Sequence, residues 1–153
     1  MTALICGSMA YDNIMVFQDR FKRHILPDKV HILNVSFLVP SLRREFGGCA
    51  GNIAYGLTQL GGRGLPMATV GNDFDPYAER LDACAIDSRY ITTIDDAFTA
   101  QAFIITDLDD NQITAFHPGA MNHSQVNRTT DVDGVTVAIV SPDAGGVERA
   151  RAY

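Results

Sequence analysis

The segment FGGCAGN places Gly47, Gly48, Gly51 and Asn52 directly before an apolar run with helical periodicity, residues 53–60. The first N–H groups of a helix have no partner within it, and glycines let a ligand approach the backbone closely. Such a helix entry suits an oxygen-rich ligand, although tight packing of the helix against a sheet would explain the glycines equally well. Neither a Walker A loop nor the dinucleotide fingerprint GxGxxG matches this spacing.

A second candidate is Asp12, which follows the first apolar run of the chain by a few residues. In α/β proteins, ligands bind beyond the carboxyl ends of the strands, so Asp12 is expected in a loop at that edge. A carboxylate there can accept hydrogen bonds from two hydroxyl groups, as a sugar would require. The alternative is an aspartate that caps a turn.

The residues that could ligate a metal do not form a site. Asp107, Asp109 and Asn111 resemble the start of a calcium loop, but Gln112 and Pro118 stand where its glycine and glutamate belong. This segment is therefore predicted to be a solvated hairpin turn. The four histidines lack ligand spacing, and no Ser-His-Asp or Cys-His arrangement is indicated, so neither a metal nor a nucleophile is predicted.

The elements that would position these residues follow an α/β pattern. Residues 3–6, 66–71 and 135–140 are short, continuous apolar runs typical of buried parallel strands. Between them, helices are predicted over 53–60 and 75–85, the second with Asp75 as its N-cap. Strands that alternate with helices indicate a parallel sheet flanked by helices.

Two further segments have the alternation of half-buried antiparallel strands. Residues 31–39 alternate apolar and polar side chains, and residues 101–117 form two β-rich runs around an Asp-Asp-Asn turn. They predict a small antiparallel sheet beside the α/β core. Such a sheet could cover a ligand site or pack against another chain.

Composition limits the classes of partner. The chain has 153 residues, about one domain, with a formal net charge of −6 and no basic stripe, which argues against nucleic acid. No signal peptide or membrane span is predicted at the N-terminus. Three isolated cysteines indicate reduced thiols, so a cytoplasmic location is expected.

Four segments together resemble the ribokinase-like (PfkB) family of carbohydrate and nucleoside kinases: ICGSMAYDNI, FGGCAGNIAYGLTQLGG, TVGNDFDPYAERL and AQAFIITDLDDNQITAFHPGA. The resemblance spans the chain in order, corresponds to the N-terminal half of the family, and is closest to the adenosine kinase-like branch. It implies a ribokinase-like fold with a β lid. The implied core comprises residues 1–12, 46–97 and 120–153, and the implied lid comprises residues 13–45 and 98–119.

The resemblance also assigns roles to residues. Asp12 would grip sugar hydroxyls, Gly47 and Gly48 would bring backbone N–H groups against them, and Asn52 would hydrogen-bond them. Gln101 and Asp143 are two further contact candidates. The acceptor would be a sugar or a nucleoside, and Ala10 stands where ribokinases usually carry asparagine, which argues against ribose. In some relatives the lid pairs with a second subunit, so a homodimer through the lid is a further expectation.

Family members are about twice as long, and their second half carries a Gly-x-Gly-Asp motif, whose aspartate is the catalytic base, together with the site for ATP and Mg²⁺. No Gly-x-Gly-Asp occurs in this sequence. The chain is therefore expected to be truncated, to hold the acceptor and to show no turnover by itself. Two alternatives remain open, a non-catalytic binding or dimerisation module and a remnant of a truncated gene.

Overall fold

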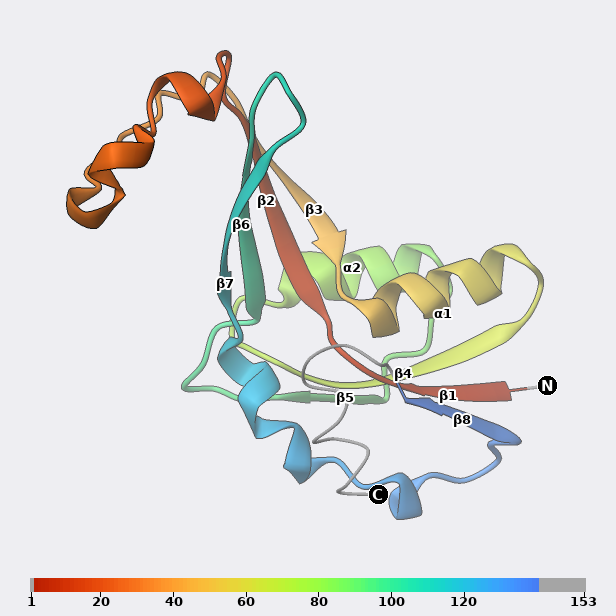
Figure 1. Ribbon diagram of the computed structural model, residues 1–153. Coiled ribbons are helices and arrows are strands. Elements are labelled where there is room, and N and C mark those ends of the chain that lie inside the picture. The colour runs from red at the N-terminus through yellow and green to blue at the C-terminus, as the bar shows by residue number, and fades with distance from the viewer. Residues whose placement is uncertain (1, 141–153) are drawn as a thin grey trace.

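The computed structural model describes residues 2–140, which form two sheets with helices around the first (Figure 1). The first sheet is parallel, with the strand order β5-β4-β1-β8. Its strands are β1 (Thr2–Cys6), β4 (Arg63–Val70), β5 (Tyr90–Thr93) and β8 (Val137–Val140). The three predicted strands are confirmed as β1, β4 and β8, and β1 and β4 are buried as expected. The expected burial is wrong for β8 among the described residues, where Val137 is 38% exposed. Strand β5 has too short an apolar pattern to be predicted.

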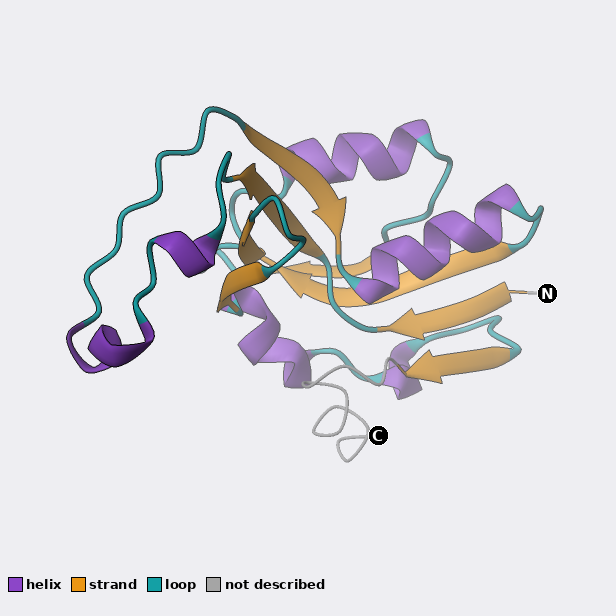
Figure 2. Ribbon diagram, turned by 45° about the horizontal axis from the view of Figure 1, so that its top comes forward, coloured by secondary structure: helices purple, strands orange, loops and turns teal. Residues whose placement is uncertain are grey.

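Helices α1 (Cys49–Gln59) and α2 (Asp75–Ala83) cover one face of this sheet, and η3 (Gly119–Val126) lies on the other (Figure 2). The main core packs Ile5, Ala68 and Val70 of the sheet against the two helices. A smaller core on the opposite face gathers around Leu4 and Met67. A short 3-10 turn, η4 (Thr129–Asp131), follows η3. Both predicted helices are confirmed, which agrees with the α/β pattern.

The starts of both helices differ from the expectation. Helix α1 begins at Cys49, so Gly47 ends the strand β3 (Leu42–Gly47), Gly48 is the N-cap residue and only Gly51 lies in the first turn of the helix. Helix α2 begins at Asp75 with Phe74 as the N-cap residue, and no side chain caps it. The prediction of Asp75 as N-cap was therefore wrong. Asp75 instead lies in the first turn, where its negative charge is favourable to the helix dipole.

The second sheet has the strand order β3-β2-β6-β7, and it stands away from the first sheet (Figure 1). Its strands are β2 (Ala10–Val16), β3 (Leu42–Gly47), β6 (Ala100–Thr106) and β7 (Gln112–His117). The hairpin β6–β7 is confirmed. The sheet is mixed rather than antiparallel, because β2 and β6 pair in parallel. Strand β2 follows β1 and β6 follows β5. Because β1 and β5 are parallel in the first sheet, β2 and β6 leave it in the same direction.

The prediction of a strand over residues 31–39 was wrong. The chain between β2 and β3 instead forms η1 (Phe21–Arg23) and η2 (Pro27–Ile32), followed by backbone without regular pairing. Burial alternates only over residues 35–39, where Val35 and Phe37 are half-buried and Leu38 is 87% exposed, whereas Leu33 is 53% exposed. Phe37 packs on Phe21, with ring centroids 5.0 Å apart. The burial of Phe37 therefore comes from this aromatic contact and not from pairing with a β-strand.

The hairpin turn is not solvated at Asp107, which corrects the sequence expectation. The side chain is buried and accepts hydrogen bonds from the N–H groups of Phe21 (2.8 Å), Asp109 and Asn111 (both 2.9 Å). Burial raises the pKa of this carboxyl, but the hydrogen bonds from Phe21 and Asn111 outweigh burial and lower the pKa to about 2. Asp107 thus connects the hairpin to η1.

Among residues 2–140, no helix is long and apolar enough to cross a membrane.

Candidate functional site

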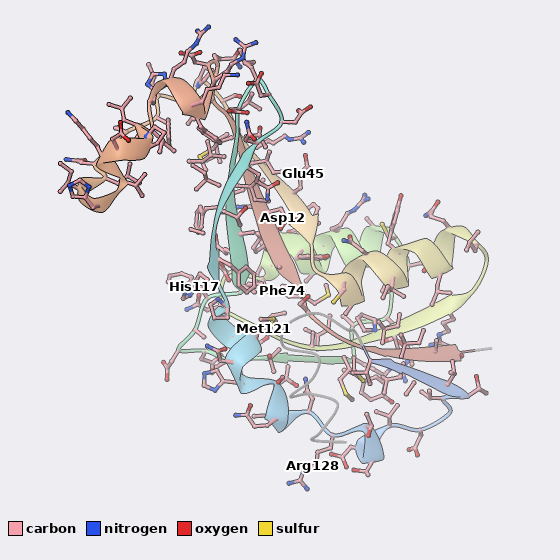
Figure 3. The ribbon with its side chains drawn as sticks, in the orientation of Figure 1. Asp12, Glu45, Phe74, His117, Met121 and Arg128 are labelled. Atoms are coloured by element: carbon pink, nitrogen blue, oxygen red, sulfur yellow. The ribbon has the colours of Figure 1, made fainter. Side chains whose placement is uncertain are left out.

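Asp12 lies in the middle of β2, not in a loop, because the chain resumes an extended conformation after only three residues. In the ladder its partners are Glu45 of β3 and Ala102 of β6, and Ala102 in turn pairs with Phe116 of β7. Paired residues project on the same face of a sheet. The row Glu45–Asp12–Ala102–Phe116 therefore crosses one face, which is named the Asp12 face below. Figure 3 shows Asp12 and Glu45 on their neighbouring strands.

The Asp12 carboxylate is half-buried, yet no residue in the described part of the chain donates a hydrogen bond to it. Burial alone raises its pKa. Buried carboxylates are normally paired or hydrogen-bonded, because removing the charge from water costs free energy. Asp12 is thus a group whose acceptor oxygens are available to a ligand that brings its own donors.

Gly47, the last residue of β3, faces this carboxylate directly. A Cβ at this position would collide with the carboxyl group of Asp12, so only glycine leaves the acid its space. The carbonyl of Gly47 accepts a hydrogen bond of 2.9 Å from the Tyr77 hydroxyl of α2. Burial raises the pKa of Tyr77 well above its usual range, so the hydroxyl stays a donor. Helix α2 therefore holds the backbone beside Asp12 in place.

Gly48 turns the chain from β3 into α1 with φ of 88° and ψ of 138°. A Cβ there would lie 2.5 Å from the Ser8 carbonyl oxygen and 2.7 Å from the Met9 Cα. Gly51 packs in a similar way against the Tyr77 hydroxyl. At these two positions the structure thus supports tight packing, the alternative reading of the glycines.

The first N–H groups of α1 are not all available to a ligand. Those of Cys49 and Ala50 donate to the Ser8 hydroxyl (3.2 Å) and the Ser8 carbonyl (3.0 Å). The expectation of free N–H groups at this helix start is therefore wrong for these two residues. Ser8, in the link between β1 and β2, caps the helix from a remote part of the chain, which the sequence does not indicate.

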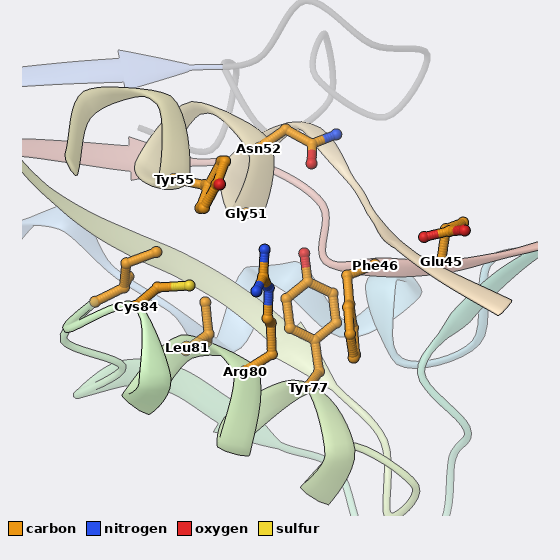
Figure 4. A pocket seen from close by; sticks show the side chains of 10 residues that line it. Glu45, Phe46, Gly51, Asn52, Tyr55, Tyr77, Arg80, Leu81 and Cys84 are labelled. Carbon is orange, nitrogen blue, oxygen red and sulfur yellow. The ribbon is translucent and has the colours of Figure 1, made fainter. Parts of the chain in front are cut away.

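Asn52 is exposed in the first turn of α1 and lines a pocket of about 210 Å³ between α1, α2 and β3. Figure 4 shows Asn52 of α1 on one side of this pocket, Arg80 of α2 on the other, and Glu45 at its edge. Glu45 also belongs to the row that contains Asp12. The pocket therefore opens beside the Asp12 face, although Asp12 does not line it.

Gln101 lies on the opposite face of the second sheet from Asp12, because its partner in the ladder is Tyr11. Its amide is bonded to Asn13 at 3.2 Å and to Asp73 at 3.3 Å. Asp143, the other additional candidate, lies outside the described residues. Ala102 and Phe116 were not predicted, since only the strand register shows that they share a face with Asp12. Within residues 2–140, no three acidic, histidine or cysteine side chains are clustered to hold a metal.

Residues 9–137 match the protein family described as "pfkB family carbohydrate kinase". The chain belongs to the PfkB family. Its members are phosphotransferases, and the two-sheet arrangement agrees with the ribokinase-like fold expected from the sequence.

Among solved structures, the PfkB chain is similar to the nucleoside kinase of Burkholderia thailandensis in complex with inosine, with 51% identity and a TM-score of 0.82. It also resembles the Methanocaldococcus jannaschii nucleoside kinase, an archaeal member of the ribokinase family, with 28% identity and a TM-score of 0.74. Each comparison covers 98% of this chain and 48% of the other.

A curated nucleoside kinase of Methanothermobacter thermautotrophicus is 36% identical over 92 residues, which cover 59% of this chain and 30% of the relative. The PfkB chain thus spans about half the length of the solved nucleoside kinases it matches.

Proposed function

We propose that this chain supplies the acceptor-binding half of an ATP-dependent nucleoside kinase, with the ribosyl hydroxyls bound at Asp12. The observation that carries the proposal is the half-buried Asp12 carboxylate without a hydrogen-bond donor among the described residues. Two sugar hydroxyls would supply the missing donors, and charge-assisted hydrogen bonds of this kind are strong. Gly47, Gly48 and Asn52 complete the proposed sugar site.

The Asp12 face favours a nucleoside over a simple sugar. Beside the acid lies the small, buried side chain of Ala102, and beyond it Phe116 is 53% exposed. Ile14 and Ile104 form the next row on the same face. A carboxylate for hydroxyls and an apolar, aromatic surface for a planar base therefore lie side by side. Inosine is the nucleoside in the complex of the B. thailandensis relative.

The chemical step is assigned to residues beyond this chain. Phosphoryl transfer needs a positioned nucleotide, cations that neutralise its phosphates and a base for the acceptor hydroxyl. The sequence has no Gly-x-Gly-Asp, and the described residues offer no cluster of carboxylates for Mg²⁺. ATP, Mg²⁺ and the base are therefore proposed to be bound by a second half, such as the one present in the relatives.

The test is to titrate the chain with inosine, adenosine and ribose by calorimetry, and to assay ATP-dependent phosphorylation of each. We expect nucleoside binding without turnover. The chain joined to the second half of the B. thailandensis enzyme is expected to phosphorylate the nucleoside. Turnover by the chain alone would contradict the assignment of the base, and failure of both the chain and the chimera to bind nucleosides would contradict the acceptor site.

Phe116→Ala is expected to weaken inosine binding about tenfold and to leave ribose binding unchanged, because base–aromatic stacking contributes about 1–3 kcal/mol. Calorimetry of both ligands measures the difference. Phe103→Ala is the matched control, since Phe103 lies on the same hairpin with similar exposure but on the opposite face. Equal losses of affinity in the two variants would rule out stacking of the base on Phe116.

The opposite face of the second sheet supports the proposed homodimer through the lid. Leu42, Met15, Ile105 and Ile113 form a row across all four strands, and Leu42 is 64% exposed. Exposed apolar surface of this kind marks interaction sites. We expect sedimentation to show a dimer that Leu42→Lys converts to a monomer, whereas Leu60→Lys, at another exposed leucine, does not. A monomeric wild-type chain would contradict this proposal.

A further inference from the structure

A line of side-chain hydrogen bonds crosses the second sheet and reaches the first. Arg44 Nε donates to Asn13 Oδ1 (3.1 Å), Asn13 Nδ2 donates to Gln101 Oε1 (3.2 Å), and Gln101 Nε2 donates to Asp73 Oδ2 (3.3 Å). Asp73 Oδ1 accepts the N–H of Thr99 at 2.7 Å. The line thus runs from β3 through β2 and β6 to the loop between β4 and α2.

The direction of these bonds is set by the two charged ends. A guanidinium can only donate, and a carboxylate can only accept. The amides of Asn13 and Gln101 could each be turned around by themselves, but either reversal would place donor against donor or acceptor against acceptor. Arg44 and Asp73 therefore determine the orientation of both amides, and the bonds form one unit.

We propose that Arg44, Asn13, Gln101 and Asp73 form a positioning relay that holds the second sheet at a defined angle to the first and thereby aims Asp12. The relay is inferred from the hydrogen bonds alone, whereas its importance for ligand binding rests on the proposed function. None of the four residues touches the proposed ligand. They act through the backbone of β2 and β6, the two strands that carry Asp12 and Ala102.

The relay joins β2 and β6 directly beside Asp12. Asn13 follows Asp12 in β2, is only 2% exposed, and also donates to the Ala102 carbonyl at 3.4 Å. Ala102 is the partner of Asp12 in the parallel ladder. A shift of Asn13 would therefore move the carboxylate and its neighbour together, whereas the buried position of Asn13 keeps water from replacing its partners.

The relay is anchored where the first sheet meets the entry to β6. Contacts of the loop after β4 hold this junction: Asp73 accepts from Thr99 N–H, Gly71 N–H donates to Thr99 Oγ1 (3.0 Å), and the Asp73 carbonyl accepts from the Tyr11 hydroxyl (3.0 Å). Thr99 and Tyr11 are fully buried. Asp73 thus connects the first sheet to both central strands of the second.

The relay can be tested by reversing it. In Asn13→Asp, Gln101 lies between two carboxylates, and its single NH₂ group can donate to only one of them. In Asp73→Asn, every orientation of the amides places two N–H donors against each other somewhere between Arg44 and Thr99. In the double variant, the new carboxylate at position 13 would accept from Arg44 and Gln101. The new amide at position 73 would donate to Gln101, while its oxygen accepts from Thr99. Net charge is the same as in the wild type, and only the bond from residue 13 to the Ala102 carbonyl is lost.

The readouts are hydrogen exchange at the amides of residues 11–13 and 99–102, the denaturation midpoint, and inosine affinity. Each single variant is expected to exchange at these amides about five- to tenfold faster and to bind inosine more weakly, whereas the double variant recovers most of both losses. Asp110→Asn, an exposed aspartate at the hairpin tip, is the control.

Additive losses in the double variant would overturn the relay, because a merely local role for each residue predicts no recovery. If wild type does not bind inosine, the proposed function fails, but exchange and stability still decide whether the four residues act as a unit. Recovery of stability without recovery of inosine affinity would show that the relay does not aim Asp12.

Discussion

Asp12→Asn is expected to weaken nucleoside binding about 100-fold and, at the same time, to make the chain more stable at neutral pH. The binding loss follows because one charge-assisted hydrogen bond is removed and the other is weakened, and such bonds contribute about 1.5–3 kcal/mol each. The stability gain follows because the half-buried carboxylate has no donor among residues 2–140. Calorimetry and urea denaturation measure the two effects.

The stability gain has a defined pH dependence. Burial raises the pKa of Asp12 in the folded chain above its unfolded value of 3.8. The charged form therefore destabilises the folded chain, fully above the folded pKa and not at all below 3.8. The advantage of the Asp12→Asn variant should be largest at neutral pH and vanish as the pH falls below 3.8.

Asp110→Asn makes the same chemical change at an exposed position and should alter neither binding nor stability. A loss of stability in Asp12→Asn at neutral pH would show that the carboxylate has a structural partner, and the acceptor site would then lose its main support.

Gly48→Ala is expected to destabilise the chain by about 3–5 kcal/mol, which is a large part of the roughly 5–15 kcal/mol typical of a domain. The backbone at Gly48 has a conformation that side chains strongly disfavour, and the new Cβ would press on the backbone of Ser8 and Met9. The β1–β2 link would have to move away from α1, and with it the strand that carries Asp12. Urea denaturation gives the loss directly.

Gly56→Ala is the matched control, because a Cβ at this position in α1 meets nothing within 4 Å. It should stabilise the helix by up to about 1 kcal/mol. If Gly48→Ala were tolerated as well as Gly56→Ala, the close approach of α1 to the β1–β2 link would not exist in solution.

Several features were predictable because their signals are local. The apolar runs of β1, β4 and β8, the helical periodicity of α1 and the turn residues of the β6–β7 hairpin each depend on a few neighbouring residues. The glycine segment was also recognised as a place of close approach. Its residue types were informative before the partner was known, since only glycine permits such contacts.

Other features could not be predicted because they depend on distant partners. Residues 31–39 alternate as a strand does, yet they pair with no strand among the described residues, and β3 pairs with β2 instead. Gln101 was predicted to contact the ligand, but a shift of one residue in register changes the face on which a side chain lies. Its pairing with Tyr11 places it in the relay.

By itself, the sequence determined the two helices, the strands β1, β4 and β8, the β6–β7 hairpin, the α/β class and the residues capable of chemistry, because these follow from side-chain size, polarity and period. Only the tertiary structure decided what those residues contact. Among the described residues Asp12 has no donor, Gly48 meets backbone, and Asn13 reaches Gln101 across 88 positions of sequence, because distant segments pack in one register. The register of the strands depends on how the side chains of both sheets are buried at once. A pattern within a few neighbouring residues carries no information about that burial.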